Sequence, residues 1–167
     1  TDHDYLRKIV EKKLLGNKTK GGYFKKGADK QVQTLDTKTI EYRTKGGDDK
    51  IKKWIAEQLD GKSCVVVLIG TNTAGRKWIT YEIEKGWGDR KGVVGVYVHN
   101  LQDSDKQQAS KGANPFASIG YGNTGKMLSS IVKAYDPPYS SSKDVYDHIS
   151  KNLATWVDEA VTIRNNA

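Results

Sequence analysis

Residues 65–69, with the sequence VVVLI, decide how this chain folds. The run is too short for a stable helix, and its β-branched residues favour an extended strand. Its side chains are apolar on both faces, as in a central parallel strand that helices cover from both sides. A second run of this kind, VVGVYV, occupies residues 93–98. We therefore expect two neighbouring strands in the interior of one parallel sheet.

The segments next to these two runs predict helices. A loop at 70–75 leads to a helix over about residues 76–86, which completes a right-handed βαβ unit. Before the first run, Asp48 or Asp49 can cap a helix with one apolar face, and Gly61 follows its end. This alternation predicts an α/β fold, with a doubly wound, mainly parallel sheet and helices on both faces.

The outer parts of the chain give weaker signals. The remaining candidate elements are helices at 2–15 and 143–162, strands at 22–25 and 38–43, and a short helix near 125–134. The last of these lies in a loop-rich segment, residues 101–142, whose length favours a functional role. The whole chain, residues 1–167, is expected to form a single domain.

Composition restricts the classes of protein to which the chain can belong. It holds one cysteine and three histidines, and no apolar run approaches the roughly 20 residues that cross a bilayer. These features predict a cytoplasmic protein with no disulfide scaffold, membrane segment, signal peptide or metal site. The net charge is +8, and residues 1–53 hold 15 Lys and Arg against 8 Asp and Glu. Such a field attracts polyanions or phosphorylated molecules, although a solvated, lysine-rich surface is the simpler explanation.

Residues 70–77, GTNTAGRK, partly match the loop that binds nucleotide phosphates. That motif needs a lysine and then a hydroxyl residue after its second glycine, where this chain has Arg76 and Lys77. A magnesium-dependent nucleotide triphosphatase is therefore not expected. What remains is a loop before a helix N-terminus at the carboxyl end of a parallel strand, a common place for phosphate groups. Thr71, Asn72 and Arg76 are its candidate substrate-binding residues, and an ordinary strand-to-helix turn is the alternative.

Two groups of side chains outside this loop are candidates for ligand contact. Trp78 and Glu82 are four residues apart and share one helix face, where an indole and a carboxylate can meet a planar cation. From spacing alone, a partly buried Trp78 beside a solvated Glu82 is the more frequent arrangement. Asn114, held extended by Pro115, can present its amide to a sugar or base. An Asx-type turn with Phe116 in the core is the alternative there.

Two stretches of the chain resemble a known family. Residues 63–84, SCVVVLIGTNTAGRKWITYEIE, and residues 110–120, SKGANPFASIG, are similar to the bacterial TIR-like domains of Thoeris antiphage defence systems. An R-[KR]-W-x-x-Y-E segment followed by K-G-x-N-P-F carries the resemblance, which extends over about residues 48–121. It implies a flavodoxin-like α/β fold and cleavage of the nicotinamide–ribose bond of NAD.

The resemblance also implies a product and partners. NAD-cleaving hydrolases of this type form an ADP-ribose derivative, often a cyclic isomer, that signals to an effector protein in antiviral defence. NAD is then the substrate, and no separate cofactor is implied. TIR-type active sites are often completed by a neighbouring subunit, which implies a homo-oligomer.

The resemblance assigns roles to individual residues. The family's catalytic glutamate falls on Glu82 and its functionally important asparagine on Asn114, whereas Trp78 and Tyr81 are expected to shape the pocket. Family members begin with an apolar strand and a pocket-forming loop, but this chain begins at Thr1, within the first predicted helix. We therefore expect either that this chain lacks the first strand, which would expose the edges of its neighbours, or that a partner or another segment supplies it.

Two other functions remain open. The same fold without catalysis would be a protein-interaction module, because many TIR domains act by self-association. The basic N-terminal third, with Lys25 and Lys26 beside Tyr23 and Phe24, suggests a nucleic-acid-binding protein as the lesser alternative. Release of nicotinamide from NAD separates the enzyme from both.

Overall fold

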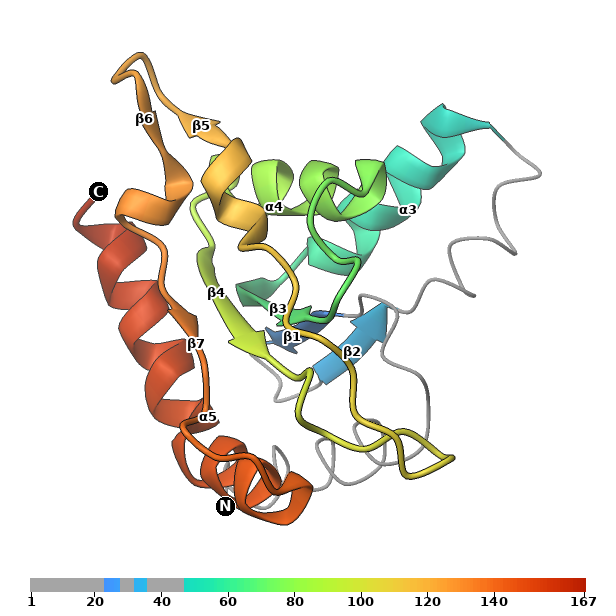
Figure 1. Cartoon of the computed structure of the whole chain (residues 1–167). Coiled ribbons are helices and arrows are strands. Elements are labelled where there is room, and N and C mark those ends of the chain that lie inside the picture. The colour runs from blue at the N-terminus through green and yellow to red at the C-terminus, as the bar shows by residue number, and fades with distance from the viewer. Residues whose placement is uncertain (1–22, 28–31, 36–46) are drawn as a thin grey trace.

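The structure is a computed structural model that describes residues 23–27, 32–35 and 47–167 (Figure 1). The helix predicted at 2–15 and the strand predicted at 38–43 lie outside these residues.

Among the residues that the structure describes, five strands form the main sheet, in the order β2-β1-β3-β4-β7. They are β1 (Tyr23–Gly27), β2 (Val32–Leu35), β3 (Lys62–Ile69), β4 (Gly92–Tyr97) and β7 (Ala134–Tyr135). β3 pairs with β4 in parallel, with Val65 beside Val93, and β4 pairs with β7 in parallel. The two interior strands predicted from the apolar runs are thus confirmed.

The strand next to β3 on its other side runs antiparallel. β1 corresponds to the strand predicted at 22–25. It pairs antiparallel with both β3 and β2, and β2 itself was not predicted. Lys25 lies opposite Val65 in this register. This edge of β3 is therefore not exposed, because β1 is hydrogen-bonded to it.

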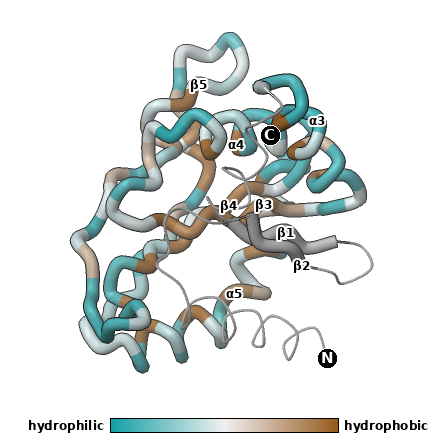
Figure 2. The backbone as a smooth tube through the Cα atoms, turned by 90° about the vertical axis from the view of Figure 1, so that its right-hand side faces the viewer, coloured by the Kyte–Doolittle hydropathy of each residue, from teal (hydrophilic) through white to brown (hydrophobic). Residues whose placement is uncertain are grey.

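Helices cover both faces of the sheet. α3 (Asp48–Leu59) and α4 (Lys77–Gly88) lie on one face and α5 (Ser142–Asn165) on the other (Figure 1). Alternate residues of β3 supply the two cores: Val65, Val67 and Ile69 pack with α3 and α4, and Cys64, Val66 and Leu68 pack with α5. In Figure 2 the hydrophobic colour is concentrated along β3 and β4, between the helices. The predicted α/β fold, with helices on both faces of a sheet whose core is parallel, is confirmed.

The ends of α3 differ in part from expectation. Gly47, with φ 80°, occupies the N-cap position, and no side chain caps the helix. Asp48 and Asp49 instead lie in the first turn, where their carboxylates interact favourably with the positive end of the helix dipole. The prediction that one of them is the cap is therefore wrong. Gly61, with φ 68°, has the positive φ expected just beyond the helix end.

The loop-rich segment contains short elements in place of the predicted helix near 125–134. They are the one-turn helix η2 (Pro115–Ser118), the hairpin strands β5 (Gly120–Tyr121) and β6 (Lys126–Met127), and the one-turn helix η3 (Leu128–Ser130). The carbonyl of Leu128 accepts from the amides of Ile131 and Val132, which accounts for the helical pattern. Beyond that turn the chain extends as β7, because pairing with β4 outweighs local propensity.

The C-terminal helix, predicted at 143–162, is α5, and the Ser141 side chain caps it by accepting from the amide of Asp144. None of the helices within the described ranges combines the length and apolar character that a bilayer crossing requires.

Candidate functional site

The two segments that carry the sequence motifs touch at the carboxyl edge of the sheet. One is the loop at 70–76, which follows β3, and the other is the segment at 110–114, which follows β4. The Thr71 hydroxyl donates a 2.6 Å hydrogen bond to the Ser110 carbonyl. Gly112 lies so close that a Cβ added to it would stand 2.1 Å from the Gly70 carbonyl oxygen. The fold therefore joins two motifs that are about 40 residues apart in the chain.

The loop after β3 is held by a threonine that the sequence analysis did not single out. Thr73 is 1% exposed. Its hydroxyl accepts from the amide of Gly70 at 2.8 Å and donates to the carbonyl of Leu68 at 3.4 Å. The signal in the sequence was a hydroxyl residue three positions after Gly70, the glycine that follows the strand. A hydroxyl at this spacing commonly closes a local turn. Arg76 donates from Nε to the carbonyl of Asn72 at 2.7 Å. Of the candidate residues of this loop, Arg76 and Asn72 are therefore in contact, and Thr71 contacts the segment at 110–114.

Glu82 is a buried charged residue on α4. Its exposed fraction is 0%, and it lies on the same buried side of the helix as Ile79 and Ile83. The arrangement that spacing alone favoured, a solvated Glu82, is therefore wrong. A carboxylate is almost never fully buried without a specific role or partner, because leaving water costs it several kcal/mol.

Trp78 and Tyr81 form a partly buried aromatic pair on the same helix. Their ring centroids are 5.9 Å apart at 81°, an edge-to-face contact, and both rings pack against the core shared by α3 and α4. Lys77 lies 4.8 Å from the centre of the Trp78 ring, and Lys52 lies 5.6 Å from that of Tyr81. The two rings therefore stand between the core and basic side chains.

Asn114 starts the one-turn helix η2. Its Oδ1 accepts from the amide of Phe116 at 2.9 Å, and Phe116 is 0% exposed. The Asx-type turn with a core phenylalanine, which was the alternative interpretation, is confirmed. It does not exclude a role in binding, because the Asn114 side chain also lines a pocket.

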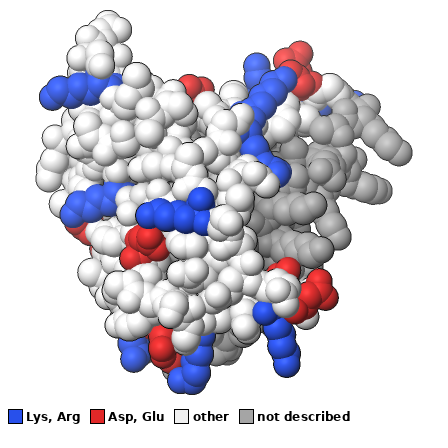
Figure 3. Space-filling view, viewed as in Figure 1, with Lys and Arg blue, Asp and Glu red and all other residues white. Residues whose placement is uncertain are grey.

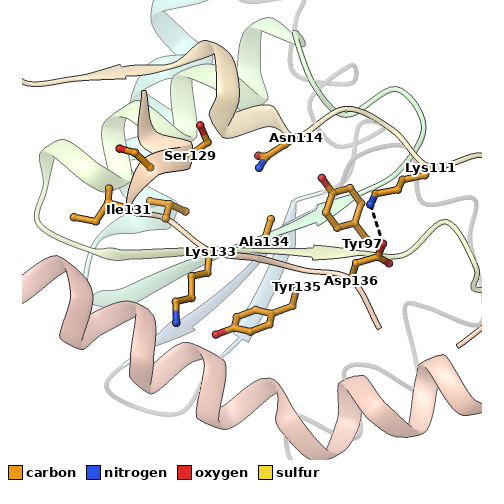
Figure 4. A pocket seen from close by; sticks show the side chains of 11 residues that line it. Tyr97, Lys111, Asn114, Ser129, Ile131, Lys133, Ala134, Tyr135 and Asp136 are labelled. Carbon is orange, nitrogen blue, oxygen red and sulfur yellow. Dashed lines mark ion pairs between the residues drawn. The ribbon is translucent and has the colours of Figure 1, made fainter. Parts of the chain in front are cut away.

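That pocket has a volume of about 520 Å³ and lies beside β7. Its lining residues are Tyr97, Lys111, Asn114, Ser129, Ser130, Ile131, Val132, Lys133, Ala134, Tyr135 and Asp136. In Figure 4, Asn114, Tyr97 and Ala134 lie on one side of β7, whereas Lys133 and Tyr135 point to the other side, toward α5. Of the predicted site residues only Asn114 lines it; those on α4 and on the loop after β3 do not.

The sequence analysis assigned no site role to several lining residues of this pocket, among them Lys111, Asp136 and Tyr97. Lys111 Nζ lies 2.9 Å from the Asp136 carboxylate and 4.6 Å from the centre of the Tyr97 ring. The hydrogen bond to Asp136 raises the pKa of the Lys111 ammonium above its usual value. Tyr97 is the last residue of β4, and the carboxyl end of a parallel strand is the usual position for a binding residue. That position was the signal available for it.

The described part of the chain shows no metal-binding group and, on the face drawn in Figure 3, no basic stripe. Among the described residues, no three His, Cys, Asp or Glu side chains gather as a metal-binding group. On the face drawn in Figure 3, the described Lys and Arg side chains are spread out, several of them beside acidic ones. This face gives the nucleic-acid alternative no support.

Comparison with known proteins identifies the family of the chain. Residues 3–103 match the family described as Thoeris protein ThsB, TIR-like domain. The chain is also 34% identical over 96 residues to a protein of Bacillus cereus (strain MSX-D12) that carries the provisional name cyclic ADP-D-ribose synthase ThsB1. That match covers 56% of this chain, and the chain spans about half (50%) of the relative's length.

The family match includes β3, α4 with Glu82, and β4, and it ends before Asn114. It covers well over half of the chain. The chain therefore belongs to the family of TIR-like domains of the Thoeris protein ThsB.

Proposed function

We propose that this domain cleaves NAD between nicotinamide and ribose and converts the ADP-ribose part into a cyclic ADP-ribose isomer. The family, and the provisional name of the Bacillus cereus relative, support this reaction class. The observation that carries the proposal is Glu82, a carboxylate with no exposed surface on a helix that begins at the carboxyl edge of β3. Strongly shielded ionisable groups beside a ligand edge are frequent at catalytic sites.

The chemistry needs negative charge more than it needs an acid. The nicotinamide nitrogen of NAD is cationic, so the C–N bond breaks with its electron pair going to nicotinamide, which leaves neutral. The ribosyl carbon becomes an oxocarbenium-like cation, as in glycoside cleavage. A fixed carboxylate shielded from water stabilises this cation, and in our proposal Glu82 is that group. A nucleophilic atom of the ADP part then closes the ring with loss of a proton, or water attacks and gives linear ADP-ribose.

The other candidate residues would bind substrate. Asn114 would orient sugar hydroxyls, because its amide can both donate and accept. Trp78 and Tyr81 would form an aromatic wall, and Thr71, Asn72 and Arg76 would contact the substrate from the loop after β3. The supporting contacts are the hydrogen bond between Thr71 and Ser110 and the approach of Gly112, which hold these segments side by side.

The product is proposed to act as a diffusible signal on an effector protein, with NAD consumed as substrate and no cofactor used. A site completed by a second copy of the chain is part of the same proposal, and it is tested by sizing the active species. A domain that releases no nicotinamide from NAD would instead be an interaction module of the same family.

Replacing Glu82 by Gln tests the mechanism. The amide keeps the size of the side chain but removes its charge, so nicotinamide release should fall by at least about 100-fold. Glu84 provides the matched control, because it lies on the same helix but is exposed, and Glu84→Gln should leave the rate unchanged. Chromatography of nicotinamide, ADP-ribose and cyclic product measures all three. Equal rates in folded Glu82→Gln and wild-type protein would remove Glu82 from the mechanism.

A further inference from the structure

The pocket beside β7 contains groups that the proposed bond cleavage does not use. Its volume of about 520 Å³ is within the usual range for a small-molecule site. Tyr97, Asn114, Ser129 and Ser130 contribute neutral hydrogen-bonding groups to its lining. Groups of this kind suit the hydroxyls of a sugar, which are themselves neutral donors and acceptors.

The charged groups of the pocket are unequally distributed. Its lining includes Lys111, Lys133 and Asp136, so the cations outnumber the anions. Lys133 also forms an ion pair with Glu159 on α5, and its side chain points away from Asn114 (Figure 4). Lys111 is therefore the cation on the same side as the neutral groups.

The ion pair of Lys111 can be exchanged at low cost. The side chains of Lys111 and Asp136 are 52% and 37% exposed, and an ion pair with this exposure contributes little to stability. The Tyr97 ring lies 4.6 Å from Lys111 Nζ and attracts the ammonium in addition to Asp136. A phosphate dianion carries more charge than a carboxylate, so it can compete for the same ammonium.

We propose that this pocket binds the phosphorylated ribose of a nucleotide, with Lys111 contacting the phosphate and Asp136 competing for Lys111. The choice of a nucleotide rests on the proposed function, since Asn114 belongs to both sites. Asp136 thereby weakens the binding of any phosphate that enters, which sets the affinity of the pocket and favours release of bound nucleotide.

The competition predicts opposite effects for the two partners of one ion pair. Lys111→Gln should weaken the binding of AMP by about 5- to 10-fold, because a charge-assisted contact is lost. Asp136→Asn should strengthen it by about 2- to 5-fold, because the competitor is removed while Lys111 stays charged. Adenosine, which lacks the phosphate, should bind both variants and the wild type alike.

The probes are AMP and adenosine, titrated into the full chain by calorimetry. The matched control is the ion pair of Lys143 and Asp147 on α5, also exposed and outside the pocket lining. Lys143→Gln and Asp147→Asn should leave AMP binding unchanged, which separates a local contact from the change in net charge.

Opposite shifts at Lys111 and Asp136, confined to AMP, support the inference. Weaker AMP binding in both variants indicates a structural ion pair, and equal affinities for AMP and adenosine indicate that no phosphate is recognised; either result overturns it. Nicotinamide release from wild-type protein is measured separately. A chain that cleaves NAD without the AMP pattern refutes only the pocket assignment, and a chain with the AMP pattern but no cleavage refutes only the proposed reaction.

Discussion

Gly112 sets the distance between the two loops of the candidate site. A Cβ at this position would lie 2.1 Å from the Gly70 carbonyl oxygen and 2.9 Å from that of Thr71. These are backbone atoms, so the loops themselves would have to separate. Gly112→Ala should therefore lower the free energy of unfolding by about 1–3 kcal/mol and displace Asn114, two residues later, so that nicotinamide release also falls. Urea unfolding and the NAD assay measure the two effects.

Gly88 is the control for this substitution. It lies at the end of α4, and an added Cβ there meets no atom within 4 Å. Gly88→Ala should leave activity unchanged and stability equal or slightly higher, since alanine favours helix. Equal urea midpoints for Gly112→Ala and the wild type would show that the close approach of the two loops does not matter.

Single residues also mark how far the sequence could predict the site. The spacing of Trp78 and Glu82 predicted a shared helix face but favoured a solvated carboxylate, and Glu82 is buried. Its catalytic assignment came from the resemblance to TIR-like domains and stays a prediction. Lys111 and Asp136 are 25 residues apart, on segments without periodicity, so only the fold could show their contact.

At the scale of elements, Tyr135 of β7 makes two contacts with α5, a ring stack and a hydrogen bond. The Tyr135 ring stacks on Trp156 with centroids 4.4 Å apart, and its hydroxyl donates to Glu159, which also pairs with Lys133. Burial, followed by the hydrogen bond to Glu159, raises the pKa of Tyr135 from 10.0 to about 12. A tyrosine pKa raised by folding stabilises the protein below its unfolded value, and this contribution is lost as pH rises to the folded value.

Tyr135→Phe tests this contact through its pH dependence. The variant should be about 1 kcal/mol less stable than the wild type at neutral pH, because the hydrogen bond is missing. The difference should shrink between pH 10 and about 12, where only the wild type has this raised phenol pKa. Urea unfolding across that range measures it. Tyr139→Phe is the control, because Tyr139 is 44% exposed. A stability difference between Tyr135→Phe and the wild type that stays constant with pH would contradict the raised pKa of Tyr135.

Long elements were predictable because each carries a repeated signal. The strands β3 and β4 and the helices α3, α4 and α5 have apolar runs or one-sided periodicity over many residues. β7 has two residues and no pattern of its own, since its conformation depends on pairing with β4. The antiparallel direction of β1 likewise depends on the strand beside it, and a strand's own sequence does not encode direction.

At the scale of the whole molecule, one sheet separates two cores that share β3 and β4. Ile55 lies in the core of α3 and α4, and Leu153 lies in the core of α5. Because the same strands supply both cores, neither is expected to persist without the other. The predicted single domain therefore implies one cooperative unfolding transition.

Truncation of one residue in each core tests this cooperativity. Ile55→Ala and Leu153→Ala should each lower the free energy of unfolding by about 2–5 kcal/mol. Circular dichroism and tryptophan fluorescence should give the same midpoint in both variants. Two separate midpoints in Leu153→Ala would mean that α5 melts independently of the rest.

The edge strand β7 affects whether copies of this protein can aggregate by strand pairing at high concentration. After two paired residues and Asp136, the chain continues with Pro137 and Pro138, and proline has no amide hydrogen to donate. A strand from another molecule therefore finds almost no ladder to extend on this side. Valine-rich segments such as residues 65–69 tend to form amyloid when they are accessible. In this fold the segment lies in β3, two strands inward from β7, and the β7 edge offers another chain little to pair with.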